Sequence, residues 1–406
     1  MKILENAMIL AGVEMAHIEK GYIAIEDGRI AEVESGSPPH RECTSTDMEG
    51  CLIIPGLINA HTHIGDSIAK EAGTGRSLHE LVQPPSGLKH KILRETPPER
   101  LISAMLDTLQ DMVRGGITTF ADFREGDLEG VRLLRAAVEG VGIRALALGR
   151  PSFQFQEVAL EANKGELPPE GIEEVRRLMG SAEGLGLSSP NEFTDRALQQ
   201  ISELFKGRGL IATHAAEHQK AIDTSVRRTG FRDTERALRC LRADFLVHLT
   251  RATKEDIRGV AEAGVPVVCC PRANAALGLG LPPMRRLVER GVTVALGTDN
   301  VMVNSPDLFR EMEFTARFLR VETGDPKVPT PLEIFSMVTI NAARLLGLGD
   351  ELGSIEQGKL ADLVVIDAEA VNLRPIRDPL STLVNRVRPD NVKMVFAGGN
   401  MVYKRS

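Results

Sequence analysis

Between residues 57 and 298 the sequence repeats one pattern eight times: a short apolar run, a polar or Gly/Pro-containing turn, and an amphipathic stretch. Apolar runs that alternate with amphipathic stretches are typical of strand–helix units and a parallel sheet. Eight such units close a barrel. The sequence therefore predicts an α/β protein with a (β/α)8 barrel of the TIM type. The predicted strands are 57–63, 117–122, 143–148, 184–189, 210–214, 245–248, 265–270 and 292–298.

The two ends of the chain have a different pattern. Strand-like runs at 2–10, 21–26 and 29–34 include a tight hairpin turn at Asp27-Gly28, and runs at 359–366, 392–397 and 400–404 include another at Gly398-Gly399. Such hairpins predict antiparallel strands, and the two ends could share one sheet.

One helix can be predicted in some detail. Thr330-Pro331-Leu332-Glu333 has the pattern of a capping box with proline at the first helical position. We expect a helix that begins there, runs through Leu346 and stops at Gly347.

Composition excludes several classes of partner. The formal net charge is -7 with both signs mixed along the chain, so there is no basic stripe for nucleic acid. No run approaches about 18 apolar residues, so we expect no membrane span. The amino terminus lacks the pattern of a signal peptide, and the five cysteines, odd in number and without Cys-x-x-Cys spacing, suggest free thiols. We expect a cytoplasmic protein.

Polar side chains stand at the carboxyl ends of several predicted strands. Alternate residues of a strand project from one face, so two histidines in a His-x-His can bind one ion together. Taken alone, such a pair fits surface or hydrogen-bonded histidines equally well, and a single histidine after an apolar run is more often a core residue. The coincidence of five such residues on one barrel rim, where active sites are built, favours a functional site. They are His61, His63, His214, His248 and Asp299.

Nearly the whole chain resembles the amidohydrolase superfamily, and within it the cytosine deaminase and chlorohydrolase-like branch that includes adenosylhomocysteine deaminases. The motifs that carry the resemblance are 55–63 (PGLINAHTH), 214–217 (HAAE), 246–248 (LVH), 270–274 (CPRAN), 296–300 (LGTDN), 307–312 (DLFREM), 341–347 (NAARLLG) and 353–363 (GSIEQGKLADL).

The resemblance implies a small β-sandwich made by both chain ends, which agrees with the antiparallel runs above. We therefore expect a composite β-sandwich of residues 1–54 and 353–406 and a barrel of residues 55–352. It also implies one divalent metal ion, zinc or iron, with zinc favoured by the imidazole and carboxylate ligands. Relatives with two metals bridge them with a lysine, usually from strand four, and no lysine stands at the tips of strands three or four here. The expected ligands are His61, His63, His214 and Asp299.

The same resemblance suggests catalytic roles. Glu217, three residues past His214, is the expected proton shuttle, although a solvated loop glutamate is the plainer interpretation. His248 would orient the attacking hydroxide or polarise the substrate; otherwise it is a core histidine bonded to a backbone group. With Asp299 as ligand and proton acceptor, these residues predict a hydrolytic deaminase of a heterocyclic amine, such as a nucleobase, nucleoside or pterin, that releases ammonia.

The substrate is less constrained. The segment 64–97 should cover the pocket, and it departs from the adenosylhomocysteine deaminase pattern. Gln83, Arg150 and Arg124 are candidate substrate contacts, and each is equally a candidate for a solvated or structural group. Two alternatives stay open: a hydrolase of a cyclic amide or carbon–halogen bond at the same site, and a non-enzymatic barrel that serves in assembly. We expect a small-molecule substrate and a homo-oligomer, a dimer or larger.

Overall fold

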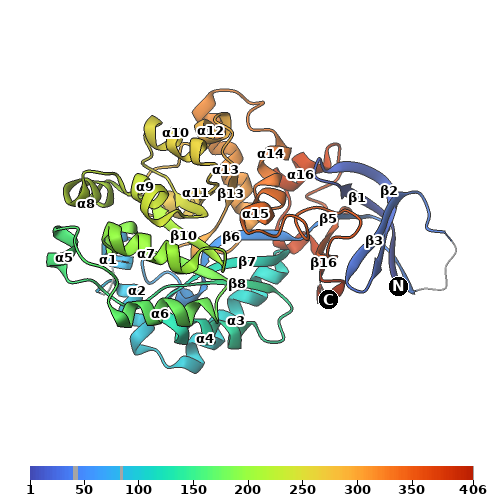
Figure 1. Cartoon of the computed structure of the whole chain (residues 1–406). Helices are drawn as coiled ribbons and strands as arrows, with labels where there is room; N and C mark the ends of the chain where they lie inside the picture. Colours follow the sequence, from blue (N-terminus) through green and yellow to red (C-terminus); the bar gives the residue numbers. More distant parts are fainter. Residues whose placement is uncertain (40–43, 83–85, 406) are drawn as a thin grey trace.

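The computed structural model describes residues 1–39, 44–82 and 86–405, and it contains two sheets (Figure 1). The larger sheet is parallel, with the order β13-β12-β11-β10-β9-β8-β7-β6-β14. All eight predicted strands are present. The chain passes from β13 into the short β14, which pairs in parallel with β6 and so closes the barrel. The strands are β6 (Leu57–His63), β7 (Ile117–Arg124), β8 (Arg144–Gly149), β9 (Gly184–Leu187), β10 (Leu210–Ala215), β11 (Phe245–His248), β12 (Val267–Cys269), β13 (Val294–Leu296) and β14 (Asp299–Asn300).

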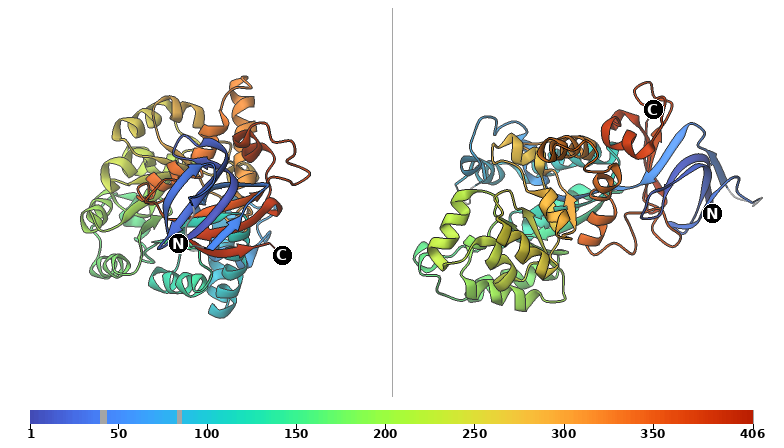
Figure 2. Two further views of the ribbon diagram at one scale, coloured as in Figure 1. Left: turned by 90° about the vertical axis from the view of Figure 1, so that its right-hand side faces the viewer. Right: turned by 90° about the horizontal axis from the view of Figure 1, so that it is seen from above.

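Helices surround this sheet, and its strands are buried almost completely, as expected for a parallel sheet covered on its outer face (Figures 1 and 2). The longer helices between the strands are α3 (Pro98–Arg114), α4 (Asp127–Val138), α6 (Pro169–Met179), α7 (Asp195–Phe205), α8 (Gln219–Thr229), α10 (Lys254–Ala263) and α13 (Leu308–Thr323). Shorter α-helices are α1 (Leu78–Val82), α2 (Leu88–Glu95), α5 (Glu157–Glu161), α9 (Asp233–Arg236), α11 (Pro271–Ala276), α12 (Met284–Glu289), α14 (Pro331–Ser336), α15 (Ile340–Leu345) and α16 (Pro379–Asn385). Short helices of other types are η1 (Ile64–Ala69), η2 (Pro190–Glu192), η3 (Ala237–Leu241) and η4 (Pro389–Asn391).

The second sheet is built by both ends of the chain, and the two termini lie on it (Figures 1 and 2). Its order is β17-β16-β15-β5-β1-β2-β3, with β4 paired to β1. The predicted hairpins are present, and the antiparallel pairing of β5 with β15 joins the two ends. The sheet is mixed rather than wholly antiparallel, because β1 pairs in parallel with β4 and β5. Its strands are β1 (Lys2–Ala11), β2 (Ala16–Glu26), β3 (Arg29–Ser35), β4 (Thr44–Asp47), β5 (Cys51–Pro55), β15 (Leu363–Asp367), β16 (Val392–Ala397) and β17 (Asn400–Lys404).

These two sheets agree with the predicted fold class. They also support the domain division that we propose, with residues 55–352 as the barrel and residues 1–54 plus 353–406 as the domain made by the chain ends. Apolar side chains from both ends meet in one core cluster, which includes Ile9, Ile23, Ile53, Val365 and Phe396.

The prediction of one continuous helix from Thr330 to Leu346 is wrong. The capping box at Thr330 and Glu333 forms as expected, but α14 ends at Ser336 and α15 begins at Ile340. The carbonyl of Met337 instead accepts a hydrogen bond from the backbone N–H of Leu296 (2.9 Å), and that of Val338 accepts one from Ile58 (2.8 Å). A continuous helix would use those carbonyls internally, so the break lets this segment bind to β13 and β6.

Among the residues that the structure describes, no helix combines the length and the apolar character needed to cross a membrane.

Candidate active site

Five side chains predicted from the sequence meet at the carboxyl rim of the barrel. His61 and His63 lie on β6, His214 on β10, His248 ends β11 and Asp299 begins β14. The potential ligand atoms fall into two overlapping groups, each within 4.8 Å: His61, His214 and His248, and His61, His63 and Asp299.

Direct distances link the two groups. The Nε2 atoms of His63 and His214 are 3.4 Å apart. An oxygen of Asp299, Oδ1, is 3.4 Å from His61 Nε2 and 3.6 Å from His63 Nε2. These atoms therefore surround one point, although β6, β10 and β14 are far apart in the sequence.

The backbone at this rim adopts conformations that L-residues rarely use. Positive φ angles occur at Ala216 (45°), His248 (77°), Leu249 (53°) and Asp299 (62°), all directly at strand ends. Such conformations cost free energy and concentrate at functional sites. At Gly297 a Cβ atom would lie 2.7 Å from the Cβ of His61, so glycine is required where the link between β13 and β14 passes close to β6.

His61 tests whether the site suits a metal ion. It is fully buried, and within the part of the chain that the structure describes neither ring nitrogen makes a well-formed hydrogen bond: Nε2 has only Asp299 Oδ1 nearby, at 3.4 Å. A buried polar group without a partner costs about 1–3 kcal/mol. Burial lowers the pKa of His61 to about 3, so the ring is neutral and its lone pair is available. A divalent ion would be bound by Nε2 of His61, the atom that faces Asp299. Three imidazoles with one carboxylate form a ligand set that suits zinc.

The surroundings of His214 and Asp299 also favour the protonation states that a metal ligand needs. Burial, followed by the neighbouring imidazoles, holds the pKa of His214 well below its ordinary value. Burial alone would raise the pKa of Asp299, but His61, His248 and His63 outweigh it and keep the carboxyl ionised. Metal ligands need neutral imidazole and ionised carboxylate, which are the forms favoured here.

The Nδ1 atoms of His214 and His63 each have a hydrogen-bond partner in the protein. His214 Nδ1 lies 3.0 Å from the carbonyl oxygen of Leu187. His63 Nδ1 lies 3.0 Å from Glu125 Oε1. Both oxygens only accept, so each Nδ1 donates and each Nε2 keeps its lone pair.

His248 is held differently. Its Nδ1 lies 3.1 Å from the amide nitrogen of Asn274, on α11. With the amide nitrogen placed toward the ring, Asn274 donates and His248 Nδ1 accepts, so Nε2 carries the proton. That Nε2 atom lies 3.6 Å from Glu217 Oε1. Burial raises the pKa of Glu217, which favours a carboxyl group that can hold and deliver a proton.

The candidate substrate contacts are less clearly placed. Gln83 lies outside the described residues. Arg124 is buried and contacts Glu125 and Asp122, at 3.2 and 3.6 Å. Arg150 pairs with Glu192 at 2.6 Å. Each of these arginines therefore already has a carboxylate partner. Contact of Arg124 or Arg150 with substrate stays a prediction.

Sequence reasoning missed several residues that contact the site. Glu125 directly follows β7, and its position one residue past a strand end was the signal that could have found it. Lys89 and Asp66 belong to the segment 64–97 that was expected to cover the pocket, and both are buried. Asn274 was noted only as part of a family motif.

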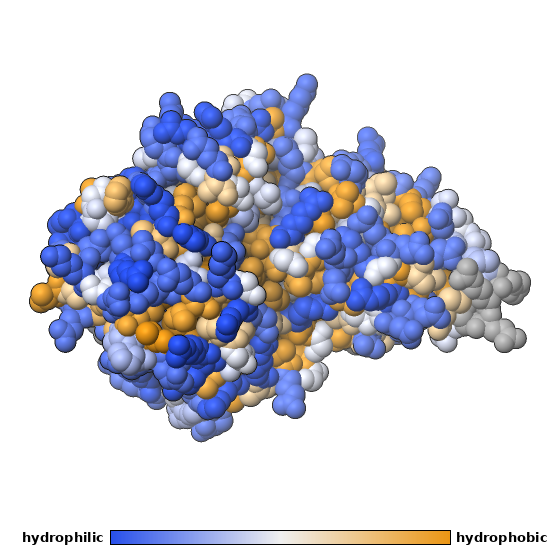
Figure 3. Space-filling view, viewed as in Figure 1, coloured by the Kyte–Doolittle hydropathy of each residue, from blue (hydrophilic) through white to orange (hydrophobic). Residues whose placement is uncertain are grey.

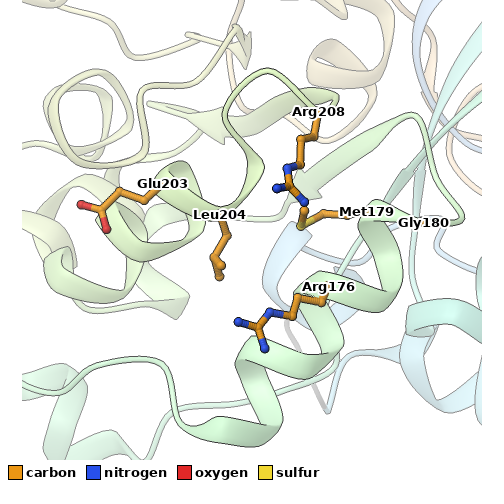
Figure 4. A pocket seen from close by; sticks show the side chains of 6 residues that line it. All are labelled: Arg176, Met179, Gly180, Glu203, Leu204 and Arg208. Atoms are coloured by element: carbon orange, nitrogen blue, oxygen red, sulfur yellow. The ribbon is translucent and has the colours of Figure 1, made fainter.

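A separate pocket of about 550 Å³ lies away from this rim (Figure 4). Its lining comes from α6, α7 and the turns that follow them, including Arg176, Leu204 and Arg208. Those turns lead into the amino ends of β9 and β10, whereas barrel active sites lie at the carboxyl ends. We therefore assign the functional site to the rim.

The face of the molecule shown in Figure 3 is mostly hydrophilic, with scattered apolar areas.

Comparisons with known proteins identify the family and the fold of the chain. The model of the family described as "Amidohydrolase family" matches residues 52–402. A protein named "Putative aminohydrolase" from Methanothermobacter thermautotrophicus is 39% identical over 406 residues, 99% of each chain. A 5-methylthioadenosine/S-adenosylhomocysteine deaminase from Moorella thermoacetica is 31% identical, over 100% of this chain and 94% of its own. The crystal structure of an adenosine deaminase from Xanthomonas campestris with bound zinc superposes with a TM-score of 0.86 at 24% identity, covering 98% of this chain and 92% of that one.

Proposed function

The chain belongs to the amidohydrolase family, and from that premise we propose that it is a metal-dependent aminohydrolase. It would replace the amino group of a heterocycle, such as a nucleobase, nucleoside or pterin, with a ring carbonyl and release ammonia. Relatives named as deaminases of 5-methylthioadenosine and S-adenosylhomocysteine cover essentially the whole chain and support this reaction class. Among these substrates we favour an adenosine-type amine.

The proposed metal is one divalent ion, zinc rather than iron, held by His61, His63, His214 and Asp299. Support comes from the buried ring of His61, whose Nε2 lies 3.4 Å from Asp299 Oδ1, and from the Nε2 atoms of His63 and His214, 3.4 Å apart. When bound, such an ion would lower the pKa of water towards about 7 and supply hydroxide at neutral pH.

The residues around the proposed ion have separate tasks in this reaction. The Nε2 proton of His248 would orient the attacking oxygen, because Asn274 occupies the other ring nitrogen. Glu217 would pass one proton from water to the ring nitrogen beside the reacting carbon. As the carbon–nitrogen bond breaks, Glu217 and Asp299 would carry the second proton of the attacking water to the amino group, which leaves as ammonia. The oxygen of water stays on the ring as the carbonyl.

One observation carries this proposal: the carboxyl of Glu217, whose pKa is raised by burial, lies 3.6 Å from His248 Nε2 on the same rim as His61, His63, His214 and Asp299. A purely structural rim would need neither the left-handed backbone at these strand ends nor a buried cluster of imidazoles and a carboxylate.

The experiment measures ammonia release by the full chain after chelation and after reloading with zinc or ferrous iron. The substrate panel holds purine nucleosides, purines, pyrimidines and pterins. We expect zinc to restore ammonia release from an adenosine-type amine and chelation to abolish it. Elemental analysis of the protein as purified identifies the metal and gives the number of ions per chain.

Two results would replace this proposal. Hydrolysis of a cyclic amide or carbon–halogen bond, without ammonia release from any amine in the panel, would assign the other hydrolase activity. Absence of bound metal, together with no effect of Asp299→Asn, would favour a non-enzymatic role in assembly.

We also propose a cytoplasmic location and a homo-oligomeric state. Free thiols at Cys51, Cys240, Cys269 and Cys270 support a reducing compartment. Fractionation of cells tests the location, and light scattering on the eluting protein tests the oligomeric state.

A further inference from the structure

His63 differs from the other histidines of the site in the group that holds it. His214 Nδ1 has a neutral backbone carbonyl as partner, whereas His63 Nδ1 has the Glu125 carboxylate at 3.0 Å. A carboxylate behind a metal-bound imidazole fixes the ring orientation and tautomer and makes the ring a stronger donor to the metal.

Glu125 is itself fixed by two cations. The ammonium group of Lys89 contacts the same oxygen, Oε1, that accepts from His63. The guanidinium group of Arg124 lies 3.2 Å from the other oxygen, Oε2. Both carboxylate oxygens of Glu125 are therefore occupied by positively charged or N–H donors, which leaves one orientation for this side chain.

Lys89 is an unusual residue to find at this place. It is only 2% exposed, and a buried ammonium group is costly unless it is paired. Its second neighbour, Asp66 Oδ2, lies 3.8 Å away. Asp66 in turn accepts from Asn300 Nδ2 at 2.8 Å, one residue past Asp299. Lys89 thus connects α2, which belongs to the segment 64–97, to both sides of the proposed metal centre.

We propose that Glu125 is a positioning residue for His63 and that Lys89 makes the seating of α2 part of that arrangement. The inference rests on the proposed metal site, and it adds to that site a dependence on a residue outside the ligand set. Glu125 touches neither metal nor substrate in this arrangement; it acts through the ring of His63.

The test compares zinc affinity of full-length variants by competition with a chelator, together with the Tm of each metal-free protein. In Glu125→Gln the amide nitrogen must face either Arg124 or the pair of His63 and Lys89, so a donor opposes a donor in both orientations. We expect zinc affinity to fall roughly 10- to 100-fold. Lys89→Met should lose a smaller factor, and Lys89→Arg, which keeps the charge, should recover most of it.

A matched control is Asp362→Asn. Like Glu125, Asp362 is a carboxylate paired with an arginine, Arg144, at 3.0 Å; its other oxygen accepts from the backbone N–H of Gly398. It lies between the two sheets rather than at the rim, so its loss should lower Tm and leave zinc affinity within about twofold of the original protein.

Each outcome decides something. Zinc affinity of Glu125→Gln within about twofold of the unmodified protein would overturn the inference while leaving the metal site intact. If Glu125→Gln does not fold, equal zinc affinity of Lys89→Met and Lys89→Arg would overturn it instead. If the unmodified protein binds no zinc, the proposed metal site fails first, and the inference falls with it.

Discussion

The barrel rim and the sheet made by the chain ends bury very different side chains. The end sheet is packed with apolar residues such as Ile23, Ile53 and Val365. The rim buries imidazoles, carboxylates and a lysine at almost the same low exposure. Burying polar groups costs free energy unless they are paired, so the rim is organised for chemistry and the end sheet for stability. Changes in one region should therefore move activity, and changes in the other should move the free energy of unfolding.

The largest difference between the effect on activity and the effect on stability is expected for Glu217→Gln. The amide cannot take or deliver a proton, so kcat for ammonia release should fall by about 10²- to 10⁴-fold. Tm and zinc content should stay near those of the unmodified protein. Steady-state kinetics on the best amine substrate checks this, and a variant that keeps more than about a tenth of the original kcat would remove Glu217 from the proposed role.

The opposite result is expected for Ile53→Ala in the end sheet. Ile53 is fully buried on β5, and removal of such a side chain costs about 2–5 kcal/mol of unfolding free energy. Denaturant unfolding measures the loss. Zinc affinity and kcat at low temperature should not change; a parallel loss of zinc affinity would show that the two regions are not independent.

A pH titration sharpens the comparison at the helices behind the rim. Burial raises the pKa of Glu311 from 4.5 to about 7, against the opposing effect of Arg272. The folded protein therefore holds this proton more tightly than the unfolded chain. The resulting stability is fully present below about pH 4.5 and is lost as the pH rises through 7, with a limit of about 3 kcal/mol.

Glu311→Gln provides the matching variant. Gln does not titrate, so this part of the pH dependence should disappear from its unfolding curve between pH 4.5 and 7. Thermal unfolding at several pH values compares the two proteins. Parallel curves for both would show that Glu311 is ionised throughout this range.

The smallest effect is expected for Asn274→Asp. A carboxylate only accepts, so it would move the proton of His248 to Nδ1 and remove the Nε2 donor that faces Glu217. We expect kcat to fall about 10-fold with zinc affinity unchanged, since His248 would lose the Nε2 donor that orients the attacking oxygen while the other groups of the site remain. Tighter zinc binding by this variant would instead place His248 in the ligand set.

Most of the fold could be predicted from the sequence because local patterns determine it. Apolar runs mark all eight barrel strands, and turn residues mark the hairpin at Asp27-Gly28. The helix from Thr330 to Leu346 was predicted incorrectly, because its interruption depends on hydrogen bonds to Leu296 and Ile58, which are distant in the sequence. Helical pattern alone carries no information about such partners.

The candidate site could be predicted in part for a related reason. Residues at strand ends converge whenever the strands form a closed barrel, so His61, His214 and Asp299 could be grouped from their positions alone. The partners of Glu125 could not be identified in this way. Lys89 lies in a segment without strand periodicity, and its contact with Glu125 depends on how α2 packs.

The sequence by itself determined the order of the barrel strands, the hairpins at the two chain ends and the five polar residues at strand ends, because these follow from periodicity and position. The choice of four metal ligands among those five residues came from the resemblance to the amidohydrolase superfamily. Only the tertiary structure decided how three histidines of the site are held: His63 by a carboxylate, His214 by a backbone carbonyl and His248 by a side-chain amide. The physical reason is that hydrogen-bond partners and burial, which set tautomer and charge, arise from atoms brought together by folding rather than from neighbours in the chain.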